Sequence, residues 1–364
     1  MESKRIFTKT DTLFFKGIGI LMIVLHNYLH RIPGYGLENE SQFSTANSID
    51  FLNLLTSFSI VDFFGAIFGF LGHYGVQIFI VFSAYGLSVQ YSKYKERPWR
   101  FVLLRLKKVY FLLFFAIAVC LVINYFTGRG VSLFEIGKRT VLLSTTLSSF
   151  SHDFMYSMFS GPFWFFALII QVYILFPLLY KLTTSFSRNN VWIVFALSFL
   201  VFYIVFFTLE DYEYTLVKWP VKFSTLGNIL GHLPEVVLGI TMAHFKFISF
   251  RKSTLFLAFV VFIGSQLHVT LFPLGFLAIS ILLIQGISYL NRISPTKFKN
   301  VILYVGQISM ILFIVNGPLR FFDFFMVEST LIRALRIFLF LPLLLGLSQL
   351  LFMVYSFLTK KLKI

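Results

Sequence analysis

Two histidines near the end of the first apolar segment are the side chains best suited to chemistry. His26 and His30 are four residues apart and share a helical face, with Asn27 between them. A histidine titrates near neutral pH and is the usual general base for a hydroxyl. The competing interpretation is that both histidines only cap a helix among the lipid headgroups. Metal binding is a further alternative, but no carboxylate or cysteine cluster accompanies the pair, so no metal is expected.

A second candidate is a basic stretch that leads into another apolar segment. Seven Lys or Arg residues fall between positions 93 and 108, and Arg105 and Lys108 lie three apart on one helical face. Two cations held in this way suit a phosphorylated ligand that arrives from the cytoplasm. Arg100 and Lys16 are added as further candidates for the same ligand. The alternative is an anchor for anionic lipid headgroups, and charge count alone does not separate the two.

Glu235 is a lone acid inside a predicted span, next to a helix-breaking Pro234. An ionisable group inside a bilayer is expensive and marks a functional candidate by default. We expect this carboxyl group either to be protonated or to pair with a cation such as a histidine. Structural packing and a place on a substrate path both remain open for it.

The composition explains what must position these residues. The chain has 364 residues, 58% of them hydrophobic and only 13% charged, with a mean hydropathy of +0.84. A soluble domain has about a quarter of its residues charged, so a water-soluble globule and a disordered chain are excluded. Continuous rather than alternating apolar runs exclude an outer-membrane barrel. Cys120 is the single cysteine, so no intrachain disulfide is possible, and no cleavable signal peptide is expected.

The predicted fold class is all-α: one polytopic membrane domain over residues 1–364, with about ten transmembrane helices and both termini cytoplasmic. A span needs about 17–25 mostly apolar residues. The segments that meet this are 13–29, 76–92, 107–126, 163–181, 191–207, 228–244, 254–271, 273–290, 301–317 and 337–358. Polar residues interrupt two further stretches, 51–72 and 131–150, which are expected to be interfacial or re-entrant pieces on the outer side.

The charge distribution supports this topology. With alternating spans, 22 of the 31 basic residues fall on the cytoplasmic side, and the outer loops are close to neutral. The formal net charge of +16 therefore reflects membrane topology, and no nucleic-acid partner is expected.

Four stretches together resemble a known family. They are KGIGILMIVLHNYLH from Lys16, GVQIFIVFSAYGL from Gly75, GPFWFFALIIQVYILFPLL from Gly161 and GQISMILFIVNGPL from Gly306. Their order and spacing are similar to those of the acyltransferase 3 family, the bacterial membrane O-acyltransferases that modify cell-surface sugars. Arg105-x-x-Lys108 looks like the family's Arg-x-x-Arg, and Trp164 and Tyr173 stand in its aromatic motifs.

The sequence departs from the family pattern at four points. Asn27 stands where the family usually has its histidine, so either His26 or His30 has taken its place or the chemistry is altered. Asn316 stands where the penultimate helix often carries a histidine. Ala84 replaces a usual glycine. Lys108 replaces an arginine, which keeps the charge but loses a bidentate fork.

The resemblance implies an enzyme of the bacterial inner membrane that moves an acyl group, expected to be acetyl, from cytoplasmic acyl-CoA to a hydroxyl of a surface glycan or lipid-linked sugar. Acyl-CoA is then a substrate, and no permanently bound cofactor is expected. Asn27, Ser83 and Asn316 would donate hydrogen bonds to the developing oxyanion. Trp164, Tyr173 and Glu235 would line the acceptor site. A homo-oligomer is compatible with this picture. The alternatives are a glycan exporter without acyl transfer and a scaffold without chemistry.

Overall fold

The computed structural model describes residues 6–364 apart from 33, 37, 40–42, 58, 93, 95–96, 127, 129, 152, 155–158, 210–222, 321–331 and 333–334. Regular structure in the described residues is helical, without strands. The main helices are α1 (Lys9–Leu29), α2 (Thr45–Leu55), α3 (Ile60–Leu71), α4 (Gly75–Tyr91), α5 (Pro98–Phe126), α6 (Leu133–Ser144), α8 (Trp164–Ser185), α9 (Trp192–Leu209), α10 (Leu233–Phe245), α11 (Lys252–Leu267), α12 (Phe272–Ile293), α13 (Thr296–Gln307), α14 (Ser309–Leu319) and α16 (Ile337–Lys361).

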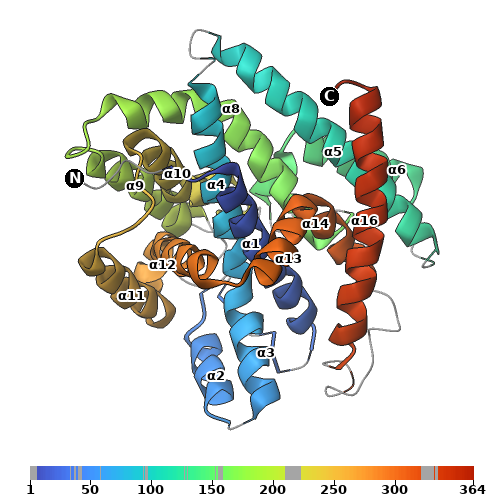
Figure 1. Cartoon of the computed structure of the whole chain (residues 1–364), viewed down its shortest axis with the longest axis horizontal. Coiled ribbons are helices and arrows are strands. Elements are labelled where there is room, and N and C mark those ends of the chain that lie inside the picture. Colours follow the sequence, from blue (N-terminus) through green and yellow to red (C-terminus); the bar gives the residue numbers. More distant parts are fainter. Residues whose placement is uncertain are drawn as a thin grey trace.

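Helix α1 lies at the centre of the bundle, between α4, α13 and α14 (Figure 1). It begins with a capping box, in which the Thr8 hydroxyl accepts from the Asp11 N–H and the Asp11 carboxylate accepts from the Thr8 N–H. Its buried residues include Phe14, Ile20, Ile23 and Val24, which belong to the hydrophobic core of the bundle. Packing against these neighbours positions the end of α1 that carries His26.

Two glycines allow α1 and α13 to pack in backbone contact. A Cβ placed at Gly17 would lie 2.2 Å from the Ile302 carbonyl oxygen, and one at Gly306 would lie 2.0 Å from the Leu13 carbonyl oxygen. Small residues at helix interfaces are typical of membrane bundles, where close packing rather than water exclusion drives association.

The membrane character of the chain is confirmed by the helices themselves. Seven described helices are long and apolar enough to cross a bilayer, and α13 with α14 makes an eighth if that bent pair is one span. Two shorter apolar helices, Ile229–Phe245 and Lys252–Leu267, coincide with the predicted spans 228–244 and 254–271. Each predicted span thus falls on an apolar helix or helix pair, and the count of ten with cytoplasmic termini stays a prediction. The chain is a multi-pass membrane protein.

Two segments differ from their predicted form. The expected span 301–317 is broken at Ile308, and its two halves meet at 72°. The expected interfacial piece 51–72 is split: its second half is α3, which continues through the short helix η1 (Gly72–Tyr74) into α4 as one apolar stretch, Ile60–Tyr91. Asp62 interrupted the apolar pattern of the sequence, but it lies in the first turn of α3, where an acid is favourable.

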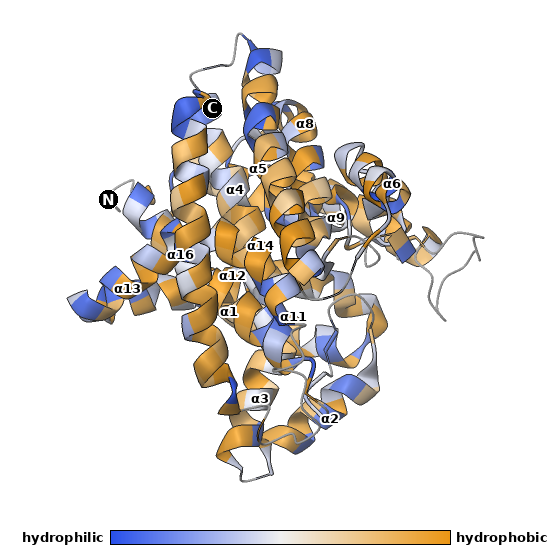
Figure 2. Ribbon diagram, turned by 90° about the vertical axis from the view of Figure 1, so that its right-hand side faces the viewer, coloured by the Kyte–Doolittle hydropathy of each residue, from blue (hydrophilic) through white to orange (hydrophobic). Residues whose placement is uncertain are grey.

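Apolar residues dominate the middle of the bundle, while hydrophilic residues gather near several helix ends (Figure 2). Helix α6, from the other doubtful stretch 131–150, has 12 residues and spans roughly 18 Å. That is too short for the hydrocarbon core of about 30 Å, in agreement with its prediction as an interfacial piece.

Candidate active site

The end of α1 places His26 in a buried and oriented position. Its side chain is 4% exposed, and its Nδ1 lies 2.8 Å from the Gly69 carbonyl oxygen of α3. A carbonyl oxygen can only accept, so the ring proton is on Nδ1 and the lone pair of the ring is on Nε2. The contact with Gly69 fixes both the tautomer and the plane of the His26 ring, as a histidine in an active site requires.

His30 carries a carboxylate partner that sequence reasoning missed. Its Nδ1 lies 2.6 Å from Oε2 of Glu38, which stands in the connection between α1 and α2. The His30 ring lies 5.4 Å from the His26 ring. A carboxylate that orients an imidazole is the arrangement found in nucleophile-activating triads. Nothing in the one-dimensional spacing of these two residues indicated their contact.

A third histidine, His73 of η1, completes the cluster. Its ring lies 5.4 Å from the His26 ring, and its side chain is buried. Sequence reasoning missed it because it fell in the gap between two predicted segments. A sequence signal for His73 was nevertheless present. If the apolar stretch continues through the gap, His73 becomes an ionisable residue within a membrane span, which marks a functional candidate.

Asn27 faces a different neighbour from the two histidines. Nη1 of Arg320 donates to the Asn27 backbone oxygen at 2.9 Å and to its Oδ1 at 2.6 Å. Arg320 is the C-terminal cap of α14 and is buried. Asn27 therefore anchors a guanidinium, and its side-chain NH₂ remains a donor.

Asn316 of α14 is fully buried, and neither atom of its side-chain amide has a hydrogen-bond partner among the residues that the structure describes. The next residue, Gly317, packs against the hydroxyl of Ser160, which a Cβ there would overlap at 1.8 Å. A Cβ at Gly161 would lie 3.2 Å from Nη2 of Arg320. An unsatisfied buried amide costs about 1–3 kcal/mol, so Asn316 is a candidate donor to a bound group.

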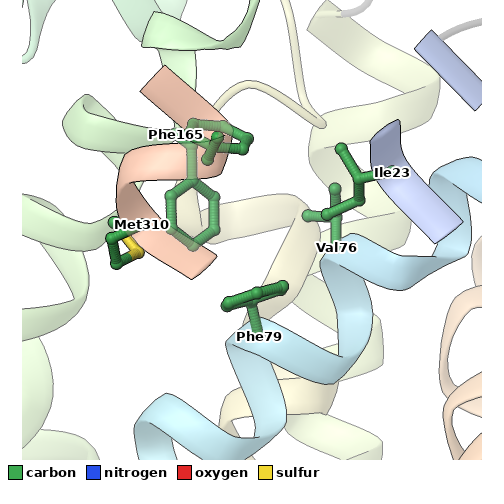
Figure 3. A pocket seen from close by; sticks show the side chains of 6 residues that line it. Ile23, Val76, Phe79, Phe165 and Met310 are labelled. Carbon is green, nitrogen blue, oxygen red and sulfur yellow. The ribbon is translucent and has the colours of Figure 1, made fainter. Parts of the chain in front are cut away.

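A narrow apolar pocket lies about one helical turn from Asn27 and Asn316. Its lining residues come from α1, α4, α8 and α14 (Figure 3): Ile23, Val76, Phe79, Phe165, Met310 and Phe313. Ile23 precedes Asn27 by one turn, and Phe313 precedes Asn316 by one turn. The cavity volume is about 10 Å³, room for one water at most, so a larger guest requires the surrounding side chains to move.

One face of α4 connects the pocket to the basic stretch. Val76, Phe79, Ser83, Gly86 and Gln90 follow at helical spacing, and a Cβ at Gly86 would have no neighbour within 4 Å. Their exposure rises along the series, from buried at Val76 to exposed at Gln90. Ser83 thus lies on the pocket face, one turn beyond Phe79.

Arg105 meets this face at its exposed end. Its guanidinium donates to Oε1 of Gln90 and lies 5.1 Å from the ring centre of Phe101. Lys108 and Arg100 are exposed on the same helix, and Lys16 is partly buried on α1. Gln90 and His73 are roughly 25 Å apart along the helical stretch, so the structure does not bring the cationic and histidine clusters together.

The remaining candidates separate into two groups. Trp164 packs edge-on against the pocket residue Phe165. Tyr173 lies further along the same helix, close enough to Arg105 for an electrostatic interaction between the two side chains. Glu235 lies elsewhere: its Oε1 is 3.8 Å from Nδ1 of His232, and both side chains are buried. The expected histidine partner of Glu235 is thus present, and the pair belongs to the α10 packing rather than to the His26 cluster.

Tyr35 holds the connection that carries Glu38 against α3. Its hydroxyl donates to Oδ1 of Asp62 at 2.6 Å, and its ring packs on Gly65. Burial, together with this hydrogen bond, raises the pKa of Tyr35 to about 12. The phenol therefore stays a neutral donor throughout the physiological pH range.

The comparison with known families covers almost the whole chain. Residues 14–359 match a family model described as an acyltransferase domain. No curated protein and no solved structure matches the chain. The matched stretch runs from α1 to α16 and includes both the histidine cluster and the Arg105 end of the α4 face. The chain therefore belongs to the acyltransferase 3 family and is a membrane acyltransferase.

Proposed function

We propose that the protein is an O-acetyltransferase of the bacterial inner membrane, which transfers an acetyl group from cytoplasmic acyl-CoA to a hydroxyl of a surface glycan or lipid-linked sugar. The observation that carries the proposal is the oriented, buried His26, whose Nδ1–H donates to the Gly69 carbonyl oxygen and so places the ring lone pair on Nε2. It stands beside a second histidine with its own carboxylate and about one turn from an apolar pocket. This is the combination that activation of a hydroxyl requires.

In the proposed reaction, His26 Nε2 accepts the proton of the acceptor hydroxyl while its oxygen attacks the thioester carbonyl. The C=O electron pair moves to oxygen and forms an oxyanion. Collapse of this intermediate breaks the C–S bond, and the CoA sulfur takes the proton back from His26. The Asn316 amide, one turn from the pocket residue Phe313, and the buried Arg320 guanidinium would donate hydrogen bonds to this oxyanion, and a dry site strengthens their effect.

The donor is proposed to enter along the α4 face. Arg105, Lys108 and Arg100 would bind the CoA phosphates at the exposed end. The acyl arm would then pass Gly86 and Ser83 toward the pocket between Phe79 and Phe165. The open space beside Gly86 and the falling exposure along α4 support this route.

Replacing Arg105 by Ala tests the donor end. We expect the KM for acyl-CoA to rise roughly 10- to 100-fold, because a charge-assisted hydrogen bond to phosphate contributes about 1.5–3 kcal/mol. Arg105→Lys should recover part of this affinity, since it keeps the charge and loses the fork. Arg188→Ala, at an exposed arginine after α8, is the matched control. Unchanged acyl-CoA binding in Arg105→Ala would remove the phosphate-binding role.

The proposed function is tested with the purified protein in liposomes. Radiolabelled acetyl-CoA is supplied with a polysaccharide acceptor, and acetyl esters are counted on the glycan and as free acetate. We expect transfer to the glycan, with slow hydrolysis when the acceptor is omitted. Two results together would instead identify an exporter. The purified protein would not consume acetyl-CoA, and deletion of the protein would prevent unmodified glycan from reaching the cell surface.

A further inference from the structure

We propose that His26, His30 and Glu38 form a binding site for one Zn²⁺ ion, and that zinc bound there inhibits acyl transfer. Each of the three residues offers one ligand atom, and these atoms all lie within 4.8 Å of one another. They come from the last turn of α1, its C-terminal cap and the connection to α2. The fold therefore assembles a donor set that the sequence does not display as a motif.

The orientation of His26 favours coordination through a defined atom. Its Nδ1–H is engaged by the Gly69 carbonyl oxygen at 2.8 Å, which leaves Nε2 as the ligand atom. Metal-binding histidines almost always donate their other ring N–H to a carbonyl or carboxylate, which fixes the ring and raises its basicity. The Gly69 carbonyl oxygen provides this contact for His26.

Glu38 and His30 occupy the geometry of a metal-free pair. Their closest atoms, Oε2 and Nδ1, are 2.6 Å apart and form an ion pair when His30 is protonated. Two ligands held at about 2.0–2.1 Å by a tetrahedral ion are roughly 3.3 Å apart. Zinc binding therefore requires these two atoms to move apart by only about 0.7 Å.

The donor set selects the class of metal. Two imidazoles and one carboxylate suit Zn²⁺, whereas Mg²⁺ and Ca²⁺ take oxygen ligands throughout. Three protein ligands leave a fourth position for water. The ion can reach the site through His30, because the side chain of this residue is 38% exposed. Glu38 and His26 are largely buried behind it.

Inhibition follows from the proposed function, on which this part of the inference rests. The same Nε2 of His26 cannot hold a metal ion and accept the proton of an acceptor hydroxyl. Bound Zn²⁺ therefore removes the base, and a chelator restores it. Binding itself depends only on the geometry of the three residues.

The experiment measures zinc on the purified full-length protein in detergent, after chelator treatment and gel filtration. Zn²⁺ alone is added, and bound metal is read by titration calorimetry and elemental analysis. We expect one Zn²⁺ per chain and no response to Mg²⁺. His30→Ala and Glu38→Gln should each weaken Zn²⁺ binding at least about tenfold. His268→Ala, at an exposed histidine with local contacts to Thr270, should bind zinc like the parent chain.

Two results would overturn the site: no zinc on the parent protein, or equal zinc affinity in the parent, His30→Ala and Glu38→Gln. Glu38→Gln keeps the shape of the side chain, so it decides the matter even if a histidine variant fails to fold. Acetyl transfer is measured on the same samples. An active protein without zinc binding refutes only the metal site, whereas a zinc-binding protein without transferase activity refutes only the proposed function and its inhibition.

Discussion

Replacing His26 by Ala should lower the rate of acetyl transfer by roughly 10²- to 10⁴-fold, the usual contribution of a general base. His26 is buried, and the contact of its Nδ1–H with the Gly69 carbonyl oxygen fixes the tautomer that carries the lone pair on Nε2. Because the α4 face and Arg105 are untouched, we expect the loss in kcat rather than in the KM for acyl-CoA. The measurement is steady-state transfer from labelled acetyl-CoA in liposomes.

The matched variants identify which histidine takes the proton. His30→Ala and Glu38→Gln should lower the rate less if they only position the site, and His268→Ala should leave it unchanged. A full loss in His30→Ala with an active His26→Ala would transfer the base role to His30. If His26→Ala and His30→Ala both transfer acetyl at the parental rate, neither histidine is the general base. Folding is checked by gel filtration of each variant.

Replacing Gly306 by Ala should strongly destabilise the protein, although it adds a single methyl group. That group would lie 2.0 Å from the Leu13 carbonyl oxygen, so α1 and α13 must separate. Overpacking of a tight contact costs roughly 1–3 kcal/mol, and here the clash is with backbone, which cannot rotate away. We expect a marked fall in the midpoint of thermal unfolding in detergent, with reduced yield of folded protein.

Gly286→Ala is the matched control for this variant. It makes the same change in the neighbouring helix α12, where an added Cβ meets nothing within 4 Å. Alanine is favoured over glycine in a helix by about 0.8–1.0 kcal/mol, so its unfolding midpoint should stay level or rise. Equal midpoints for Gly306→Ala and the parent chain would contradict the close packing of α1 on α13.

The sequence was sufficient for the elements that a bilayer imposes. Long apolar runs and the asymmetry of Lys and Arg predict a helical membrane protein, and every predicted span falls on an apolar helix or helix pair. The bend at Ile308 could not be predicted, because it depends on how α13 packs against α1. Continuity from Ile60 to Tyr91 was hidden by Asp62, an acid in the first turn of α3.

The candidate site was predictable where its residues share one helix. His26, Asn27 and His30 stand together in the sequence, and so do Arg105 and Lys108. Glu38, His73 and Arg320 reach the site through a connection, a helix junction and the end of α14, so no periodicity in the sequence links them to His26. The partners of a residue are tertiary information. The separation of the cationic end from the histidine end, in contrast, follows from the predicted topology, which puts Arg105 and Lys108 on the cytoplasmic side and the histidines near the outer side.

The length of the Ile60–Tyr91 stretch has a structural consequence. Its 32 residues extend over roughly 48 Å, well beyond the hydrocarbon core of about 30 Å. The α3 part carries Gly69, which fixes the His26 tautomer, and the junction packs so closely that a Cβ at Gly72 would lie 2.7 Å from the His26 Cβ. The same stretch carries Gln90 at its α4 end, which accepts a hydrogen bond from Arg105. One continuous element therefore bears both the carbonyl group that orients His26 and the side chain that contacts Arg105, so the two ends of the proposed site share a single scaffold.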